Sequence, residues 1–207
     1  MLPEQKSICG LLLAGGQSRR MGGGDKCLMT LGGKTLLQRI LDTAMPQVGP
    51  LVLNTNSDPA LFGAYELPVA PDVIDGFAGP LAGVLTGLEW AQANAPECDW
   101  VASFACDAPF APADLVARLV AAVMDQDADM ACANSGGRDH PVFALWPVRL
   151  ADDLRKAVVN EELRKVDVWT GRYKIARVEF DAGQGDPFFN VNRPEDLEAA
   201  AALLGHA

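Results

Sequence analysis

A glycine-rich, basic stretch reads Leu13-Ala-Gly-Gly-Gln-Ser-Arg-Arg-Met-Gly-Gly-Gly-Asp-Lys26, and it begins where the apolar run Ile8–Ala14 ends. The apolar run has the length of a buried strand, so the basic stretch is predicted to be the loop that leaves this strand. In a parallel α/β sheet such loops lie beyond the carboxyl ends of the strands, where ligands bind. Glycines let backbone N–H groups approach phosphates, and arginine and lysine add charge-assisted hydrogen bonds. We therefore predict an anion site in this first loop (residues 13–26).

The rest of the chain alternates short apolar runs with longer amphipathic stretches. The apolar runs predict strands at Ile8–Ala14, Leu51–Asn54, Leu67–Ala70, Trp100–Ala105, Asp129–Ala133, Pro141–Trp146 and Tyr173–Phe180. The amphipathic stretches predict helices at Thr35–Met45, Gly79–Ala95, Ala111–Asp125, Val148–Val159, Glu161–Val168 and Pro194–Leu204. Strands buried on both faces, in alternation with helices, indicate a mainly parallel sheet covered by helices. Because no linker or repeat interrupts the pattern, we predict one three-layer α/β domain over residues 1–207.

Two familiar phosphate motifs do not fit, and local signals place some helix ends. The dinucleotide fingerprint G-x-G-x-x-G fails at Gly15–Arg20, and a P-loop ending at Gly33-Lys34-Thr35 would need its first glycine at Leu28. Gly32-Gly33 is better interpreted as a turn before a helix that begins near Lys34 or Thr35. We expect Pro112 in the first turn of the third helix and Asn192 as the cap of the last helix.

The composition restricts the class of protein. The net charge of −10 argues against nucleic acid as a partner, whereas residues 1–41 carry six basic side chains and only two acidic ones, which favours a local anion site. No apolar run is long enough to span a membrane, and the first residues lack the features of a signal peptide, so we expect a cytoplasmic protein. Five scattered cysteines form no C-x-x-C pair, and Cys9, Cys106 and Cys132 are expected to be buried in strands.

The residues also carry a resemblance. The first loop is similar to the pattern L-A-G-G-x-S-x-R-M-G-x-x-K of nucleotidyltransferases with a Rossmann-like fold. Its Gly-Gly-x-Asp-Lys form resembles the molybdenum cofactor guanylyltransferase (MobA) family. Further matches follow in the family's order, at Gly79-Pro-Leu-Ala-Gly83, Cys106-Asp-Ala-Pro109, Arg138-Asp-His-Pro-Val-Phe143 and Phe189-Asn-Val-Asn-Arg-Pro-Glu-Asp196. The resemblance covers nearly the whole chain and is least recognisable at Val148–Thr170.

The resemblance implies transfer of GMP from GTP to the terminal phosphate of molybdenum-molybdopterin, with Mg²⁺ as cofactor and release of pyrophosphate. It implies a nucleotide site at Leu13, Ala14, Gly15, Lys26, Asn54, Asp72 and Asp107. It implies catalytic roles for Arg20, Lys26 and Asp107, with the metal on Asp107. It implies an acceptor site at Arg138, His140, Asn190 and Asn192. Residue chemistry agrees, because a carboxylate at a strand end suits Mg²⁺ and Asp72 could accept from the N–H edge of guanine.

The expected mechanism needs little beyond alignment and charge. The acceptor phosphate is already an anion, so no side chain has to deprotonate it. We expect Arg20 and Lys26 to neutralise the triphosphate, and magnesium on Asp107 to bridge the α-phosphate and the leaving pyrophosphate. By analogy with the family, the product would pass directly to a molybdoenzyme or an insertion chaperone.

Other interpretations remain open at this point. The chain could be a cytidylyltransferase on molybdopterin, a transferase for another small phosphorylated acceptor, or a nucleotide-binding regulator without catalysis. His140 could be a turn residue before Pro141 instead of an acceptor contact. The D-x-D patterns in Asp125-Gln-Asp127-Ala-Asp129 are found in sugar-nucleotide glycosyltransferases, although their place after a helix favours a solvated acidic turn.

Overall fold

The computed structural model describes residues 5–15, 25–74, 76, 79–183 and 185–204 as one α/β domain built on a central sheet. The strands are β1 (Ile8–Leu13), β2 (Thr30–Leu31), β3 (Lys34–Thr35), β4 (Leu51–Asn54), β5 (Val69–Ala70), β6 (Trp100–Ala105), β7 (Met130–Ser135), β8 (Arg138–Pro147) and β9 (Ile175–Phe180). The α-helices are α1 (Leu36–Ala44), α2 (Pro80–Asn94), α3 (Leu115–Gln126), α4 (Ala151–Asn160), α5 (Val166–Thr170) and α6 (Pro194–Leu204). Short 3₁₀ helices occur at Gln5–Ser7, Lys26–Leu28, Met45–Gln47, Pro59–Tyr65 and Val148–Leu150.

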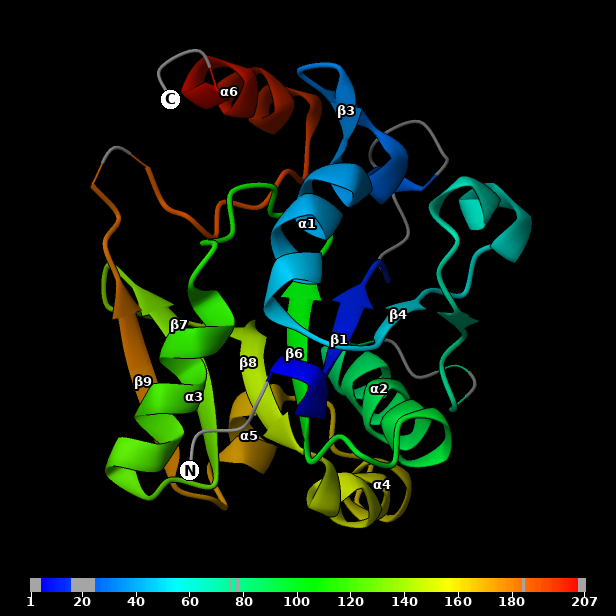
Figure 1. The fold of residues 1–207 in the computed structure, drawn as a ribbon, viewed down its shortest axis with the longest axis vertical. Helices are drawn as coiled ribbons and strands as arrows, with labels where there is room; N and C mark the ends of the chain where they lie inside the picture. The colour runs from blue at the N-terminus through cyan, green and yellow to red at the C-terminus, as the bar shows by residue number, and fades with distance from the viewer. Residues whose placement is uncertain (1–4, 16–24, 75, 77–78, 184, 205–207) are drawn as a thin grey trace.

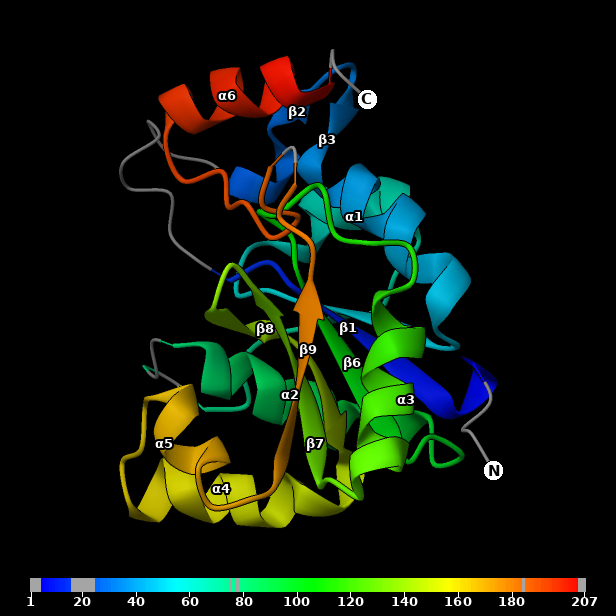
Figure 2. The same ribbon diagram turned by 90° about the vertical axis from the view of Figure 1, so that its left-hand side faces the viewer.

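The domain has three layers (Figures 1 and 2). In the described part of the chain the main sheet has the order β5-β4-β1-β6-β8-β7-β9, and β8 is its antiparallel member. Helices α1 and α3 cover one face, whereas α2, α4 and α5 cover the other. The predicted α/β class with a mainly parallel sheet is therefore confirmed.

Strand β1 lies at the centre of the part of the sheet that carries the first loop. It pairs in parallel with β4 on one side and with β6 on the other. Ile8 and Leu12 pack into the core under α1 and α3, and Leu11 packs into the core under α2. A strand between two helical layers must be apolar on both faces, which is why the sequence shows a continuous apolar run here.

Helix α2 packs closely on the sheet because two of its buried residues are glycines. A Cβ atom added to Gly87 would lie 2.5 Å from Leu11 Cδ2. A Cβ atom added to Gly83 would lie 2.7 Å from Leu13 Cδ2 and 2.5 Å from Asn54 Oδ1. The helix backbone can therefore approach the carboxyl ends of β1 and β4 only where side chains are missing.

Several predicted boundaries were wrong. The third helix begins at Leu115 and not at Ala111, because Ala111 precedes Pro112 and is biased away from the helical region. The Leu115 N–H group donates to the Pro112 carbonyl, so the proline lies in a turn before the helix.

The helix predicted at Glu161–Val168 does not form over most of that range. Glu162 has a φ of 53°, and the Leu163 N–H group donates to the Ala157 carbonyl, which turns the chain away after α4. Helical structure returns only in α5. The five residues 161–165 therefore form a loop, which we call the 161–165 loop.

The start of α1 and the cap of α6 also differ from the prediction, whereas α6 begins at Pro194 as predicted. Gly32-Gly33 forms the turn of the β2–β3 hairpin, and Thr35 caps α1 by accepting from the Gln38 N–H group at 3.0 Å. At α6 the Asp196 carboxylate accepts from the Asn192 and Arg193 N–H groups, at 2.7 and 2.9 Å. Asp196 takes the capping role predicted for Asn192, whose side chain has another partner.

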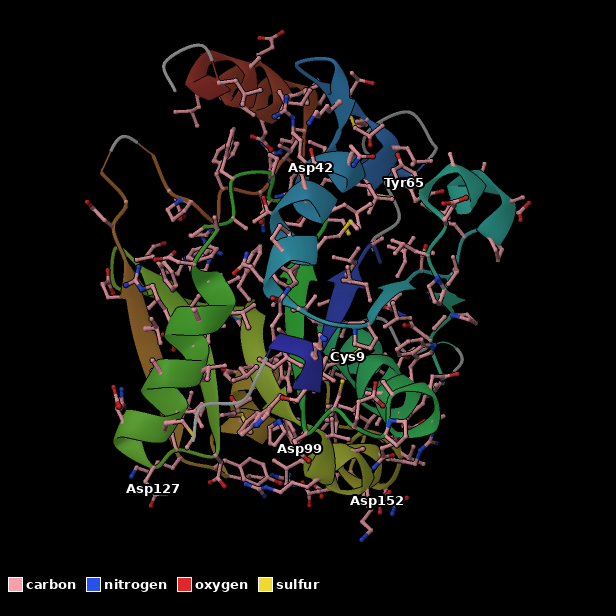
Figure 3. The ribbon with its side chains drawn as sticks, in the orientation of Figure 1. Cys9, Asp42, Tyr65, Asp99, Asp127 and Asp152 are labelled. Atoms are coloured by element: carbon pink, nitrogen blue, oxygen red, sulfur yellow. The ribbon has the colours of Figure 1, made fainter. Side chains whose placement is uncertain are left out.

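The aspartates after α3 form a surface turn, as the sequence favoured. Asp127 ends α3 with a φ of 48°, and Asp129 pairs with Arg149 at 2.6 Å. In Figure 3 the side chains of Asp127, Asp99 and Asp152 lie toward the end of the molecule where β1 and β6 begin, opposite to the carboxyl ends of these strands. The D-x-D patterns are therefore remote from the predicted anion site.

The cysteines are buried in the structure, as expected from the sequence for three of them. All five cysteines are free and buried, and burial raises the pKa of the Cys9 and Cys132 thiols to about 12. The prediction that Cys9, Cys106 and Cys132 are buried is confirmed. Among the residues that the structure describes, no helix is both long enough and apolar enough to cross a membrane.

The packing of α2 can be tested with one methyl group. Gly87→Ala should lower the free energy of unfolding by about 1–3 kcal/mol, because the new Cβ would overlap Leu11 in the core. Gly63→Ala is a matched control: its Cβ would have no neighbour within 4 Å in the part of the chain that the structure describes, and the change should stay within about 0.5 kcal/mol. Urea unfolding measures both, and equal stability of the two variants would contradict the packing.

Candidate active site

The carboxyl ends of β1, β4 and β6 form the floor of the candidate site. Beyond β1, the Ala14 N–H group donates to the Asn54 carbonyl at 3.0 Å, and the Cys106 N–H group donates to the Leu13 carbonyl at 3.0 Å. These bonds extend the sheet by one step and fix the start of the first loop. Among the described residues, a Cβ atom on Gly15 would have no neighbour within 4 Å. Arg20 lies outside the described residues.

Lys26 connects three segments that are far apart in the sequence. Its Nζ lies 2.8 Å from Asp107 Oδ2, directly after β6, and 2.6 Å from Asn192 Oδ1, before α6. The Val191 N–H group donates to the Asp107 carbonyl at 2.8 Å and holds the third segment in place. The Lys26 and Asp107 side chains are 14% and 29% exposed, so solvent screens this ion pair only partly. A cation therefore stands beside a carboxylate at the edge where the first loop begins and ends.

A second set of polar side chains lies at the ends of β4 and β5; it consists of Asn54, Asn56 and Asp72 and is called the Asn54–Asp72 group. Asn54 is buried, and its Nδ2 donates to the Ala70 carbonyl at 3.1 Å and to Asp72 Oδ1 at 2.9 Å. Asn56 Nδ2 donates to Asp72 Oδ2 at 2.8 Å, and Asn56 Oδ1 accepts from the Asp72 N–H group. Each carboxylate oxygen of half-buried Asp72 thus has one amide donor and keeps further acceptor capacity.

Sequence reasoning missed Asn56 and Ser57, two adjacent residues that contact Asp72 and Asp25 respectively. Ser57 Oγ donates to Asp25 Oδ1 at 2.5 Å, which ties the end of the first loop to the segment after β4. Asn56 was also missed, although it follows Asn54 by two residues at the predicted carboxyl end of a strand. Its position was the available signal; its partner depended on the pairing of β4 with β5, which a single sequence does not give.

The predicted acceptor residues come from two segments at the same edge of the sheet. Arg138 and His140 lie on β8, and because β8 is antiparallel its first residues meet the carboxyl ends of its neighbours. Arg138, Asn190 and Asn192 are exposed. His140 is buried within the strand, so the interpretation of His140 as a turn residue was wrong.

His140 has a defined environment. Its Nε2 lies 2.7 Å from Ser135 Oγ, and its ring centroid lies 4.7 Å from that of Phe188. Burial lowers the pKa of His140 below its usual value, and the nearby Asp186 carboxylate opposes that shift only in part. The imidazole is therefore neutral at pH 7.

The 161–165 loop reaches the start of α2. A Cβ atom on Gly79 would lie 3.6 Å from the Arg164 carbonyl oxygen. This loop carries the exposed side chains of Arg164 and Lys165. A helix was predicted here, so the approach of the Arg164 backbone to Gly79 was missed.

A mainly parallel sheet, with a lysine held between a carboxylate and an amide at the carboxyl ends of its strands, agrees with the nucleotidyltransferase class that the sequence resembles. The chain matches the model of the MobA-like NTP transferase domain over residues 10–174, and it belongs to that family. The family resemblance seen in the sequence is thereby confirmed.

Individual relatives agree with this assignment. The chain is 54% identical to the molybdenum cofactor guanylyltransferase of Bradyrhizobium sp. (strain ORS 278), over 95% of this chain and 93% of the relative. It is 51% identical to the protein of that name from Mesorhizobium japonicum, over 97% of each chain. The molybdopterin-guanine dinucleotide biosynthesis protein A of Archaeoglobus fulgidus shares the fold with a TM-score of 0.74, at 23% identity over 96% of this chain and 100% of that one.

The close approach of Gly83 in α2 to Asn54 predicts that a larger residue at position 83 weakens GTP binding. Gly83→Ala would place a methyl group against Asn54 Oδ1, and we expect it to weaken GTP binding by at least about tenfold. Gly87→Ala strains the same helix one turn further from the edge and should change GTP affinity by less than about twofold. Calorimetric titration of both variants measures the effect. Equal losses of affinity would show that α2 packing matters only for stability.

Proposed function

We propose that this enzyme transfers GMP from GTP to the terminal phosphate of molybdenum-molybdopterin and releases pyrophosphate, which yields the molybdopterin guanine dinucleotide cofactor. The observation that carries the proposal is the position of Lys26 between Asp107 and Asn192. We propose that this cation lies where the phosphates of the nucleotide and the phosphate of the acceptor meet. The names of the relatives specify guanylyl transfer to the molybdenum cofactor and do not favour a cytidylyltransferase or a regulator.

In the proposed mechanism Lys26 exchanges partners. In the structure its charge is balanced by Asp107, and on nucleotide binding it is proposed to turn to the phosphate oxygens. There it would neutralise negative charge that grows on the leaving pyrophosphate. Arg20, which lies outside the described residues, is proposed to share this role. The acceptor phosphate is already anionic and attacks without a general base, so alignment and charge supply the catalysis.

Asp107 is the proposed Mg²⁺ residue, and its chemistry fits that role. Mg²⁺ in nucleotide sites is usually held by one or two carboxylates together with substrate phosphates and water. The Asp107 carboxylate follows β6, is partly exposed and stands within reach of the same lysine as the phosphates. The described residues contain no group of three or more histidine, cysteine, aspartate or glutamate side chains able to hold a metal ion. The bound ion would supply charge neutralisation of the phosphates.

The base of the nucleotide is proposed to lie against the Asn54–Asp72 group. Guanine offers N1–H and N2–H donors on one edge, and each Asp72 oxygen keeps the capacity to accept one more hydrogen bond. The two asparagine amides hold that carboxylate in one orientation. The backbone of Leu13, Ala14 and Gly15 is proposed to line the path from the base to the phosphates.

The acceptor is proposed to bind at Arg138, His140, Asn190 and Asn192, with Arg164 and Lys165 from the 161–165 loop facing it across the start of α2. We propose that residues 1–207 act as a single nucleotidyltransferase domain in the cytoplasm. Direct hand-off of the product to a molybdoenzyme or an insertion chaperone belongs to the same proposal, since a pterin dinucleotide is large and prone to oxidation. Nucleic acid and membrane have no part in it.

The proposed function is tested by pyrophosphate release with molybdenum-molybdopterin as acceptor and Mg²⁺ present, in parallel reactions with GTP, CTP, ATP and UTP. Release with GTP alone is the expected result. Turnover with CTP instead would move the chain to a sibling activity on the same fold. No release with any nucleotide, from protein that binds GTP, would favour the regulator.

The variant Asp72→Asn tests whether the Asp72 carboxylate recognises guanine. The variant would turn one amide N–H₂ group toward the amide of Asn54 or Asn56 and remove acceptor capacity from the guanine edge. We expect GTP turnover to fall while the poor activity with CTP changes less. Equal losses for both nucleotides would contradict a role of Asp72 in selecting guanine.

A further inference from the structure

The seven residues Asp186–Asn192, here called the acceptor segment, carry both asparagines proposed to bind the acceptor. The segment has no helix or strand of its own, yet its residues are held at several points. Val191 is fully buried, and its N–H group donates to the Asp107 carbonyl at 2.8 Å. Asn192 accepts from Lys26 at 2.6 Å. These contacts hold the C-terminal end of the segment. The position of exposed Asn190 also depends on the N-terminal end, at Asp186.

Asp186 shapes that end. Its Oδ1 accepts from the Phe188 N–H group at 2.9 Å, and its carbonyl accepts from the Phe189 N–H group at 3.0 Å. The side chain and the backbone of one residue thus close the same turn. The same Oδ1 also accepts from Ser135 Oγ at 2.7 Å, which anchors the turn on the end of β7.

The hydrogen-bond directions in this group follow from Asp186. A carboxylate can only accept, so the single Ser135 hydroxyl proton is donated to Asp186. Ser135 Oγ must then accept from His140 Nε2, at 2.7 Å, which requires the neutral imidazole to carry its proton on Nε2. The chain of donors therefore runs from His140 through Ser135 to Asp186. We call these three residues the clasp.

This direction excludes nucleophilic catalysis by Ser135. A serine nucleophile must donate its proton to the histidine, whereas here the histidine donates to the serine. Ser135 and His140 are also buried, at 4% and 7% exposure. Ser135 and His140 are therefore closed to solvent, although the Asp186 side chain is 37% exposed, and the clasp holds structure instead of attacking a substrate.

Aromatic packing adds a second restraint on the same turn. Phe188 is 2% exposed, and its ring centroid lies 4.7 Å from His140, 4.8 Å from Phe143 and 5.4 Å from Phe180. His140 is thus linked to the acceptor segment in three ways. Ser135 bridges it to Asp186, its Nε2 lies 4.0 Å from Asp186 Oδ2, and its ring packs on Phe188.

We infer that Ser135, His140 and Asp186 are positioning residues, which hold the acceptor segment in its binding conformation before the phosphorylated acceptor arrives. His140, which is buried, acts on acceptor binding through this clasp, and this indirect role replaces the direct acceptor contact proposed above for His140 alone. The inference rests on the proposed function for the identity of the acceptor. It assigns to His140 the role of positioning the residues that contact the acceptor. A preformed segment binds more tightly because its ordering cost is met during folding.

The kinetic test compares Ser135→Ala and Asp186→Ala with Asp186→Asn. The two alanine variants should raise KM for molybdenum-molybdopterin about tenfold, the equivalent of ~1.4 kcal/mol, and leave KM for GTP within about twofold. Asp186→Asn keeps an oxygen that accepts the same two hydrogen bonds, so it should restore most of the acceptor affinity. Pyrophosphate release at saturating GTP measures each KM.

Ser103→Ala is the matched control for stability. Ser103 is a fully buried serine of the same sheet, and its Oγ accepts from Trp146 Nε1 at 2.8 Å, away from the acceptor segment. It should lose stability as Ser135→Ala does but keep the wild-type KM for the acceptor. An unchanged acceptor KM in Ser135→Ala, or an equal rise in Ser103→Ala, would overturn the inference.

Amide hydrogen exchange gives a second test that needs no substrate. In the ligand-free protein the N–H groups of Phe188 and Val191 should be protected, and Ser135→Ala should speed exchange at Phe188 at least about tenfold, whereas Ser103→Ala should not. Unprotected amides in the wild type, or equal rates in the two variants, would overturn the inference. If the wild-type enzyme released no pyrophosphate, the proposed function would fail, and hydrogen exchange would still decide whether the clasp holds the segment.

Discussion

The contact of Lys26 with Asp107 and Asn192 is the interaction on which the candidate site depends. One ammonium group joins the first loop, the end of β6 and the segment before α6, at 2.8 and 2.6 Å from its two partners. The chain carries a net charge of −10, so a cation held at this edge has to be kept in place by local partners. The pair is only partly buried, and under the proposed function the lysine exchanges Asp107 for phosphate oxygens. The proposal therefore gives nucleotide binding and catalysis to the same side chain.

The surrounding fold brings the partners of this lysine together. The parallel strands β1, β4 and β6 end at one edge, and α2 approaches that edge because Gly83 leaves room for Asn54 and Leu13. The antiparallel β8 starts at the same edge and adds Arg138 and His140. Figure 2 shows α6 and the β2–β3 hairpin side by side beyond the carboxyl ends of β1 and β6. The site is therefore a product of strand direction more than of any single motif.

Much of the fold was predictable because burial leaves a strong pattern in the sequence. The limits of β4, β6 and α6 follow directly from apolar runs and from the proline that begins α6. The 161–165 loop was not predictable, since the turn at Glu162 depends on how α4 and α5 pack and not on helix propensity. The candidate site residues follow strand ends, so their approximate location could be predicted. Their pairing could not, because the contact of Asn54 with Asp72 depends on strand register and that of Lys26 with Asn192 joins residues far apart in the chain.

The most direct test of this account is the single-turnover rate of GMP transfer in Lys26→Met, with GTP and molybdenum-molybdopterin both saturating. The account predicts a fall of about 30- to 1000-fold, the equivalent of ~2–4 kcal/mol, because a preorganised cation is lost from the developing charge. Lys34→Met is the matched control and should keep the wild-type rate, since Lys34 pairs with Asp42 on the surface. A Lys26→Met rate within about twofold of the wild type would contradict the central role of this lysine.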